Sequence, residues 1–562
     1  MWLSQVLHRN RQCLGDRTAL IDADRSLTWT ELDERTTRLA RGLAARGVAK
    51  GDRVAILSLD RVEVIEAYFA LAKLGALFVP LNHSLTVPEV TDMVRRTGAG
   101  VLLGEAALLD RHPDLPVRLR LAVDGPEYAE LTAARTGNTT ARTGNTTART
   151  GDTAARTGDT AARTGNTEAR TGNTDAAEEE FPLPAVADTD LAAILHTSAT
   201  TGRAKGVTVD HGSFRGISLG WLAVAAPSDD MVLVNCCPLY HGSMTVILTY
   251  LAAGATVVLL PGFTPQRALA AMERHRATHV WLVPQMLRFL LQSKAMASTE
   301  LGSLREVMYG AAPMPVELHA EAAERLDCGF RQVYGMTEVG GPFATLGPAD
   351  HRAARPDAPL PAGRVIPGMS VRVLDDAGTE LPLGAVGEIT VRGPGLMRGY
   401  WNNPAATAEI TVDGWIRTGD LGLLDESGLI RLVDRRKDLI LRAGQNVYPA
   451  EIEQALLTHP LVRDAAVVGV PDADYGEVPK AYVVTGPAPS ADSATDNSAT
   501  DSSTTDSTTD TATDGAPAVT RAELMAHLTE RLAPYKRPRQ LEFIDQVPRS
   551  PAGKILKKLL RA

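Results

Sequence analysis

Apolar and polar residues alternate in two rhythms along the first 430 residues of the chain. The stretch 52–59 is a short apolar run typical of a buried strand, 62–76 has helical spacing, and 77–82 is a second short apolar run. The order strand, helix, strand predicts two neighbouring parallel strands. Short apolar runs of the same kind recur at 255–262, 278–284 and 305–311. The pattern therefore predicts an α/β fold with mostly parallel sheets and flanking helices.

One helix boundary can be located from its capping residues. Thr30-Glu31-Leu32-Asp33 resembles a capping box, in which a hydroxyl and a carboxylate satisfy the first backbone N–H groups of a helix. We expect this helix to end near Gly47, because glycine readily adopts the left-handed conformation found after a helix.

The pattern changes after about residue 434, where a smaller unit is predicted. Its expected elements are a helix at 448–457, strands at 462–471 and 479–486, a helix at 521–532 and a basic tail. We therefore predict a large N-terminal domain over 1–433 and a small, mobile α+β domain over 434–562.

Two segments lack the apolar residues that a packed element needs. Six near-identical heptads, beginning ARTGNTT, fill 134–175, and a Ser/Thr/Asp-rich stretch fills 487–518. The heptads offer no apolar seam for a coiled coil, and neither segment buries enough surface to offset its ordering entropy. We expect both to be disordered inserts, with a short repetitive β-structure as the alternative for the heptads.

The tetrapeptide Arg-Thr-Gly-Asp occurs three times, but only one copy is a candidate for chemistry. Two copies lie in the heptads, where Asp alternates freely with Asn. The third, at 417–420, lies in a strand, turn, strand pattern that predicts a β-hairpin. A hairpin can aim a carboxylate, so Asp420 is the candidate.

Composition excludes several classes of protein. The chain has 562 residues and a net charge of −9, and six of its Asp residues lie in the second insert. The remainder is near neutral, which does not suggest a nucleic-acid partner. Four cysteines without a C-x-x-C pair favour a reducing compartment over a disulfide framework or a zinc site. We find no signal peptide and no apolar run of 18 residues, so we expect a cytoplasmic protein without a membrane span.

Two stretches could bind phosphate and metal. The stretch 191–207 places clustered hydroxyls and Lys205 after a strand that ends at Leu195, as a phosphate-binding loop would. The alternative is a polar connecting loop. The stretch 331–341 offers Tyr334 as a flat face for a base and Glu338 as an oxygen ligand for Mg²⁺. The alternative is a helix start capped by Thr337.

Two later stretches could complete a nucleotide site. In 413–453, Asp420 could accept hydrogen bonds from both hydroxyls of a ribose, and Arg435 could add a donor; the alternative is a charged surface turn. In 547–560, Lys554 follows a Gly turn and is expected to start a basic amphipathic helix. The alternative is a solvated basic tail.

These four stretches, in this order, resemble the adenylate-forming superfamily of acyl-CoA synthetases, luciferases and the adenylation domains of peptide synthetases. The resemblance runs from about Asp16 to Arg561 and is interrupted only by the two inserts. The segments 309–315, 441–453 and 547–560 are most similar to stand-alone fatty- or aryl-acid CoA ligases.

The resemblance implies ATP-dependent activation of a carboxylic acid as an acyl adenylate, followed by transfer to coenzyme A. Its cofactors would be ATP, Mg²⁺ and coenzyme A. The implied residues for the β- and γ-phosphates are Thr197, Ser198, Thr200, Thr201, Gly202 and Lys205. Those for adenine are Gly310, Ala311, Ala312 and Tyr334. Thr337 would contact the α-phosphate, Glu338 would ligate Mg²⁺, and Asp420 and Arg435 would bind ribose.

The resemblance also assigns roles to residues around the reacting groups. Lys554 would bridge the carboxylate and the α-phosphate, Lys437 is at the expected hinge, and the loop with Gly444 would line the channel for the thiol arm. His241 is at the position of a gate beside the acyl pocket. The other pocket candidates are Trp221, Tyr240, Met286, Gly310 and Met336.

The sequence departs from the family pattern at Ala199 and Ala204, where glycine and proline are usual. If the usual glycine has a positive φ, alanine at 199 costs roughly 1–2 kcal/mol, which would weaken ATP binding. Because Glu338, Asp420 and Lys554 are all present, we still expect an active enzyme. Three functions therefore stay open: a CoA ligase, an adenylating enzyme that loads a carrier protein or amine or activates an oxyanion such as nitrite, and an AMP-binding regulator. The pocket region lacks the Asp that pairs an α-amine, so a fatty or aromatic acid is favoured over an amino acid.

Overall fold

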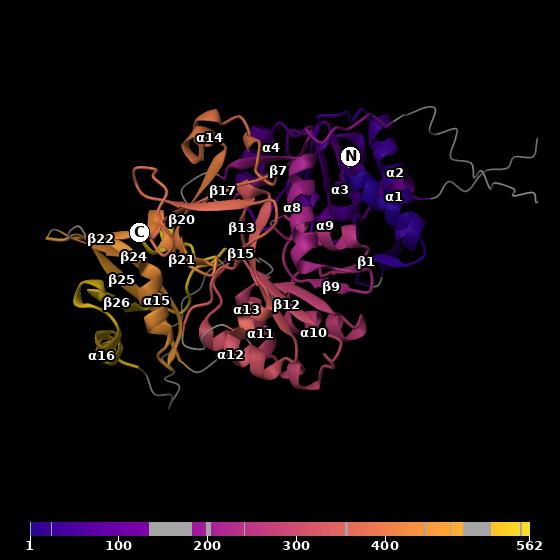
Figure 1. Cartoon of the computed structure of the whole chain (residues 1–562). Coiled ribbons are helices and arrows are strands. Elements are labelled where there is room, and N and C mark those ends of the chain that lie inside the picture. The colour runs from indigo at the N-terminus through magenta and orange to yellow at the C-terminus, as the bar shows by residue number, and fades with distance from the viewer. Residues whose placement is uncertain are drawn as a thin grey trace, which may run out of the picture.

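The computed structural model describes residues 2–23, 25–133, 183–197, 204–240, 242–353, 358–442, 445–472, 474–486, 519–550 and 554–561. Both predicted inserts, 134–175 and 487–518, lie outside these residues, so their disorder stays a prediction. Figure 1 shows a large part built on several sheets, with a smaller part carrying β22–β26, α15 and α16 at one side.

Two large sheets organise the first 400 residues. The first sheet has the order β15 (Arg364–Val365), β14 (Gly341–Leu346), β13 (Gly329–Met336), β12 (Glu306–Gly310), β11 (His279–Leu282), β9 (Val232–Asn235), β10 (Thr256–Leu259), β1 (Thr18–Asp22), β2 (Arg25–Thr28). The second has the order β18 (Gly399–Tyr400), β8 (Gly206–Asp210), β7 (Leu191–His196), β4 (Leu77–Pro80), β3 (Arg53–Leu57), β5 (Val101–Gly104), β6 (Leu119–Ala122). In the first sheet, neighbouring strands pair in parallel from β13 through to β1 in the order given, and in the second sheet they do so from β7 through to β6. The strands outside these runs pair antiparallel.

The main core contains side chains from both sheets and from the helices α1 (Trp2–Leu14), α2 (Trp29–Ala45), α3 (Val62–Leu74), α8 (His211–Ala225) and α9 (Ser243–Ala253). Helix α3 is buried along its whole length, as its nearly unbroken apolar sequence requires. Tyr68 on α3 packs edge-on against Phe78 and Phe214, with ring centroids 5.0 and 5.8 Å apart. These contacts join α3 to β4 of the second sheet and to α8.

Further helices surround these two sheets. They are α4 (Val87–Thr97), α5 (Ala106–Asp110), α6 (Pro126–Thr132), α10 (Pro265–Arg274), α11 (Pro284–Gln292), α12 (Val316–Arg325), α13 (Pro348–Ala353) and α14 (Pro404–Ile410). A second core cluster combines side chains of α10, α11 and α12 with strands of the first sheet, and a third combines α4 with the second sheet. The parallel strands therefore have apolar cores on both faces, as this sheet type requires.

Two smaller sheets follow. The third is antiparallel and contains β16 (Ser370–Leu374), β17 (Gly387–Arg392), β19 (Thr411–Val412), β20 (Trp415–Leu424) and β21 (Ile430–Arg435). The fourth contains β22 (Ile440–Arg442), β23 (Gln445–Val447), β24 (Val462–Asp472), β25 (Gly476–Thr485) and β26 (Gln540–Phe543). It packs with α15 (Pro449–Leu457) and α16 (Arg521–Arg531) around its own core. The chain passes from the third sheet to the fourth across 436–439.

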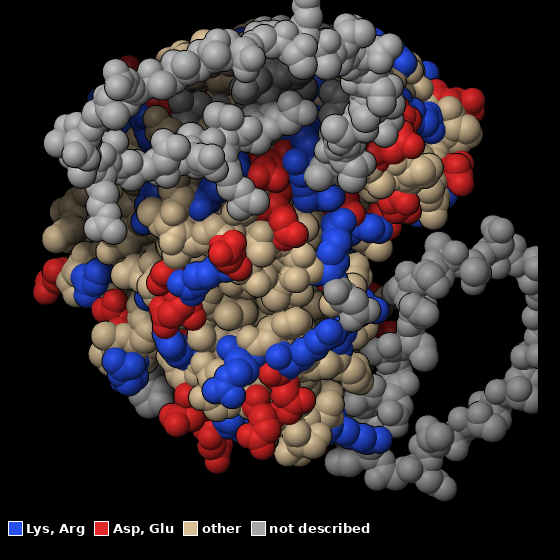
Figure 2. Space-filling model, turned by 90° about the vertical axis from the view of Figure 1, so that its right-hand side faces the viewer, with Lys and Arg blue, Asp and Glu red and all other residues tan. Residues whose placement is uncertain are grey.

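The architecture confirms the predicted fold class, a large α/β part with mostly parallel sheets and a small α+β part. The boundary near residue 434 and the mobility of the small part stay predictions. Among the described residues, no helix is both long enough and apolar enough to cross a bilayer. Figure 2 shows charged residues of both signs interspersed over the face that it presents, rather than one continuous basic surface.

Two local predictions were wrong. The capping residue of α2 is Thr28 rather than Thr30: its hydroxyl accepts from Glu31 N at 3.2 Å, and Glu31 Oε2 accepts from Thr28 N at 2.8 Å. Thr28 ends β2 in an extended conformation, so its side chain faces the first turn. The basic tail does not form a helix from Lys554. Ser550 N donates to Lys554 O and Leu556 N donates to Pro548 O, both at 2.8 Å, so this backbone folds back on itself and only the short 3₁₀ turn Lys557–Leu560 follows.

Candidate functional site

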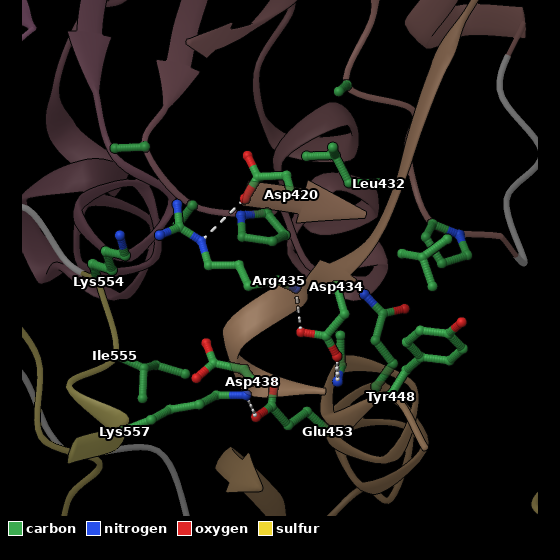
Figure 3. Close-up of a pocket in the computed structure, with 18 of the residues that line it drawn as sticks. Asp420, Leu432, Asp434, Arg435, Asp438, Tyr448, Glu453, Lys554, Ile555 and Lys557 are labelled. Atoms are coloured by element: carbon green, nitrogen blue, oxygen red, sulfur yellow. Dashed lines mark hydrogen bonds and ion pairs between the residues drawn. The ribbon is translucent and has the colours of Figure 1, made fainter. Parts of the chain in front are cut away.

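A cavity of about 1140 Å³ opens between the large and small parts of the protein. Its lining comes from the loop after β12, from β13, from the β20–β21 hairpin, from α15 and from the C-terminal tail. Figure 3 shows Asp420, Arg435 and Lys554 around one end of this space. The cavity thus collects residues from segments far apart in the sequence.

Asp420 lies on β20 and forms a three-residue cluster at the cavity wall. It is the register partner of Arg435 on β21, and its Oδ1 lies 3.2 Å from the Arg435 Nε. Its Oδ2 accepts a hydrogen bond of 2.7 Å from the hydroxyl of Tyr334. Although only 8% exposed, Asp420 lines the cavity. A carboxylate held this way is pre-positioned to accept further hydrogen bonds from a bound hydroxyl.

Tyr334 connects this cluster to the first sheet. It lies on β13, with its ring centroid 4.7 Å from that of Phe343 on β14. Burial, and then the negative charge of Asp420, raise the pKa of Tyr334 well above its ordinary value. The phenol therefore keeps its proton and remains a donor to Asp420 at physiological pH.

Lys554 reaches the same end of the cavity from the C-terminal tail (Figure 3). Its backbone is tied to Ser550 by two hydrogen bonds, one in each direction. Burial, together with the positive charges of Arg435 and Lys437, lowers the pKa of Lys554 to about 8. Lys554, Arg435 and Lys437 therefore lie close enough to repel one another, although Asp420 and Asp438 partly offset this effect on Lys554. A bound anion would further favour the charged form of Lys554.

The lower wall of the cavity is held together by hydrogen bonds and ion pairs among β21, α15 and the C-terminal tail. Asp434 Oδ2 accepts from the backbone N of Ala450 in the first turn of α15, at 2.9 Å. Lys557 and Glu453 form an ion pair of 2.8 Å, which Figure 3 also shows. Arg561 pairs with the buried Asp438 at 2.9 Å. These contacts hold α15 and the tail against the end of β21.

A second polar cluster lies at the end of β13. Glu338, in the short turn Thr337–Val339, accepts a hydrogen bond of 2.8 Å from the hydroxyl of Tyr400 on β18. The Lys205 ammonium lies 4.7 Å from the centroid of the Tyr400 ring. The loop between β7 and β8 is closed by Thr197 N, which donates to Lys205 O at 3.0 Å, and by Lys205 N, which donates to Thr197 Oγ1 at 3.3 Å.

The structure therefore distributes the predicted site residues over these two clusters. Around the cavity it collects Ala311, Ala312, Tyr334, Asp420, Arg435, Lys437 and Lys554. Gly310 lies directly before Ala311, and a Cβ on it would meet Val333 Cγ2 at 2.5 Å. The second cluster holds Thr197, Lys205 and Glu338, with Thr337 beside it. Six predicted residues lie outside the described residues: Ser198, Thr200, Thr201, Gly202, His241 and Gly444. Ala199 lies there too.

The loop after β12 has an unusual backbone. Ala311 has a φ of +65°, in the left-handed region that is costly for any residue with a side chain. Its backbone and that of Ala312 run along the cavity wall. Strain of this kind persists where the surroundings fix the chain, and it often accompanies a binding surface.

Sequence reasoning missed Gln332 and Tyr400. Gln332 lines the cavity from β13, and its place two residues before Tyr334 on the same strand was the available signal. Tyr400 contacts both Glu338 and Lys205. No local pattern predicts this, because Tyr400 meets each partner only through the tertiary fold.

Comparison with known proteins gives matches along nearly the whole chain. Residues 7–401 match the family described as AMP-binding enzyme, and residues 451–554 match the AMP-binding enzyme C-terminal domain. A feruloyl-CoA synthase from an Amycolatopsis species is 35% identical over 548 residues, covering 97% of this chain and 95% of the relative. The fatty acid–[acyl-carrier-protein] ligase ScoC from Streptomyces coeruleorubidus is 34% identical over 555 residues, covering 97% and 92%.

A solved structure agrees with these sequence matches. The crystal structure of ATP-bound MatB from Rhodopseudomonas palustris is similar to this chain with a TM-score of 0.79 and 29% identity. The match covers 99% of this chain and 98% of that one. The similarity thus includes the small part as well as the large one.

Proposed function

The chain belongs to the family of AMP-binding enzymes and is a ligase of the AMP-forming, acid-activating type, and from this premise we propose that it activates a fatty or aromatic acid and transfers the acyl group to coenzyme A. In the first step a carboxylate oxygen attacks the α-phosphorus of ATP. The bond to the β-phosphate oxygen breaks and pyrophosphate leaves. In the second step a thiol sulfur attacks the acyl carbon, AMP leaves, and the thiol proton passes to solvent.

The observation that carries this proposal is the convergence of Asp420, Arg435 and Lys554 on one cavity. The Asp420 carboxylate, oriented by Tyr334, would accept hydrogen bonds from the two ribose hydroxyls, and Arg435 would add a donor. Lys554 would place its positive charge between the carboxylate and the α-phosphate, where negative charge accumulates in the transition state. The adenine ring would lie against the strained backbone of Ala311 and Ala312.

The second cluster is suited to the other end of the nucleotide. Lys205 and the hydroxyls of the β7–β8 loop, Thr197 included, would hold the β- and γ-phosphates. Thr337 would contact the α-phosphate.

Mg²⁺ would have one protein carboxylate, Glu338, which is buried and held by Tyr400. The described residues contain no group of three or more metal-binding side chains. One carboxylate together with phosphate oxygens and water is a usual environment for Mg²⁺, so the residues fit the ion. When bound, Mg²⁺ would offset the negative charge of the phosphates.

The turn Arg436–Asp438 connects the third and fourth sheets and is the proposed hinge, with Lys437 at its centre. Rotation there would withdraw Lys554 and bring the loop containing Gly444 to the cavity for the second step. His241 would act as the gate of the acyl pocket.

One alternative acceptor has specific support. ScoC, similar along nearly the whole chain, is a ligase for an acyl carrier protein. Transfer to a carrier protein uses the same first step and a thiol of the same chemistry, so only the second step separates the two functions.

The proposal is tested by measuring pyrophosphate release from MgATP with a panel of fatty, aromatic and α-amino acids, with and without coenzyme A. We expect turnover with fatty or aromatic acids and an acyl-CoA product in the mass spectrum. Lys554→Ala should lose roughly 10²–10³ in the rate of pyrophosphate release. The matched control is Lys480→Gln, because Lys480 pairs with Glu542 outside the cavity lining. Pyrophosphate release without any thioester would refute transfer to coenzyme A, and silence across the panel would refute acid activation.

A further inference from the structure

A chain of three polar side chains begins at the cavity wall beside Ala311. Tyr309 on β12 and Gln332 on β13 are register partners, and Gln332 lines the cavity. The Tyr309 hydroxyl oxygen lies 3.1 Å from the Oε1 position of Gln332 and 2.7 Å from Nε2 of the buried His351 on α13. The chain therefore links a residue in contact with the cavity to two residues behind it.

The protonation of His351 can be deduced from its contacts. Its Nδ1 lies 2.9 Å from the carbonyl oxygen of Gly347, which can only accept a hydrogen bond, so Nδ1 carries a proton. Burial lowers the pKa of His351 to about 4, so the ring is neutral at neutral pH. Its Nε2 then has a lone pair and no proton. The Tyr309 hydroxyl, whose pKa burial raises, must donate its single proton to that nitrogen.

This assignment determines which end of the Gln332 amide faces Tyr309. With its proton committed to His351, the Tyr309 oxygen can only accept from Gln332. The nitrogen and oxygen ends of an amide exchange places by a half-turn about the last side-chain bond, and hydrogen bonding decides between them. The amide nitrogen must therefore lie toward Tyr309. The other end of the Gln332 amide makes no hydrogen bond with any described residue.

We propose that Tyr309 and His351 are positioning residues that hold the Gln332 amide with its carbonyl oxygen toward the cavity, where it selects adenine over a 6-oxopurine. This rests on the proposed function, in which ATP occupies the cavity. The oxygen would accept a hydrogen bond from the exocyclic amine of adenine. The 6-oxo group of hypoxanthine or guanine would instead meet a second acceptor with no proton between them.

The surroundings of the network resist the opposite orientation. The ring of His351 lies 5.7 Å from that of Tyr309 and 5.3 Å from that of His319. The nearby charges are already paired: Arg331 with Glu306 at 2.7 Å, and Asp350 with Arg364 at 3.3 Å. A half-turn of Gln332 would place two oxygens 3.1 Å apart without a donor. An unsatisfied contact of this kind is costly inside a protein.

The test compares the affinities of full-length protein for MgATP and inosine triphosphate, measured by titration calorimetry without an acid substrate. These nucleotides differ in the substituent at purine position 6, an amine or an oxo group, and in the proton that accompanies the oxo group at N1. We expect the wild type to bind ATP about tenfold or more tightly than inosine triphosphate. This ratio corresponds to one hydrogen bond between the Gln332 oxygen and the adenine amine, without which the buried oxygen would have no donor. Tyr309→Phe frees the amide to turn, so the ATP preference should fall several-fold, mainly because inosine triphosphate binds better.

Two further variants separate positioning from structural support. Gln332→Leu should abolish the preference for ATP over inosine triphosphate. Adding Tyr309→Phe to that variant should not change the ratio of the two affinities any further. Tyr250→Phe is the matched control: its buried hydroxyl contacts Met308 Sδ at 3.0 Å, and its loss should leave the ratio unchanged. If Tyr309→Phe weakens both nucleotides in parallel at a constant ratio, Tyr309 is only structural and the proposal fails.

Folding is checked by thermal melting of every variant. Should Tyr309→Phe not fold, His351→Phe serves instead, because without Nε2 the Tyr309 hydroxyl can donate to the Gln332 oxygen and the amide can turn, so the preference for ATP should fall several-fold. An unchanged preference in that variant would overturn the proposal. A wild type that binds no ATP would contradict the proposed function, whereas one that binds ATP and inosine triphosphate equally would contradict only the amide orientation.

Discussion

Lys554 offers the most quantitative prediction, because its charge depends on whether the cavity holds an anion. Its pKa falls from an ordinary 10.5 to about 8 through burial and the charges of Arg435 and Lys437. This fall corresponds to about 3 kcal/mol against the charged form. A bound triphosphate would favour that form, so nucleotide binding should raise the pKa of Lys554 and take up a proton in mildly alkaline solution.

The size and sign of this proton uptake follow from the linkage between proton binding and ATP binding. If the bound nucleotide restores the pKa of Lys554 to about 10, the charged fraction at pH 8.5 rises from about one quarter to nearly one, an uptake of about 0.7 proton. Since the free enzyme loses its proton through pH 8 and the complex does not, ATP affinity should fall as pH rises. The predicted decrease is roughly 20-fold between pH 7.5 and 9.5.

The assay is titration calorimetry with MgATP in two buffers of different ionisation heat, with no acid present so that no turnover occurs. Lys554→Gln should abolish most of the proton uptake and flatten the pH dependence. Lys480→Gln, which removes a lysine outside the cavity lining, should change neither. Proton uptake that persists unchanged in Lys554→Gln would refute the assignment of this lysine to the phosphate end of the nucleotide.

Three further predictions concern ribose recognition, packing and acid stability. Asp420→Asn should weaken ATP binding about 10- to 100-fold, because hydrogen bonds to a charged group are worth about 1.5–3 kcal/mol. In the same titration, it should leave the binding of 2′,3′-dideoxy-ATP nearly unchanged. Gly335→Ala should lower the free energy of unfolding in urea by about 1–3 kcal/mol, because the added Cβ would lie 2.5 Å from Pro342 Cα. Burial lowers the pKa of His211 to about 4, so the unfolded state binds more protons between pH 4 and 6.5, and the free energy of unfolding decreases as the pH is lowered through this range. His211→Leu should reduce the decrease between pH 7 and 5 by up to about 2 kcal/mol. His8→Gln, on the exposed face of α1, should leave that decrease unchanged.

Each of these has a clear opposite result. Equal loss of ATP and dideoxy-ATP binding in Asp420→Asn would show that this carboxylate does not bind the ribose hydroxyls. An unchanged urea midpoint in Gly335→Ala would show that β13 and β14 can separate at this point without cost. The same acid sensitivity in His211→Leu as in the wild type would mean that other groups control stability below pH 6.5.

Local sequence pattern was sufficient to predict those strands and turns that are determined by neighbouring residues. The hairpin that carries Asp420 was predicted from apolar runs around a turn, and β20 and β21 pair as expected. Strands β3, β4, β10, β11 and β12 follow from short apolar runs in the same way. Such runs form strands because their side chains are buried on both faces of a parallel sheet.

Contacts between distant segments could not be predicted from pattern. Tyr334 was expected to offer only its ring, yet its hydroxyl also orients Asp420, 86 residues away. The tail was predicted to be helical from its basic and apolar spacing. Its backbone instead pairs with residues 548–550, because hydrogen bonds across that turn replace the helical ones. The Gln332 network likewise depends on sheet register.

The central claim is that a carboxylate of the substrate attacks the α-phosphorus of ATP in this cavity. It is tested most directly by supplying the active acid with both carboxylate oxygens labelled with ¹⁸O and measuring the mass of the AMP produced after thioester formation. The account predicts that AMP carries one ¹⁸O atom from the acid. The bond between phosphorus and that oxygen persists when the thiol displaces AMP from the acyl carbon. Unlabelled AMP, or label in an inorganic phosphate released with ADP, would contradict it.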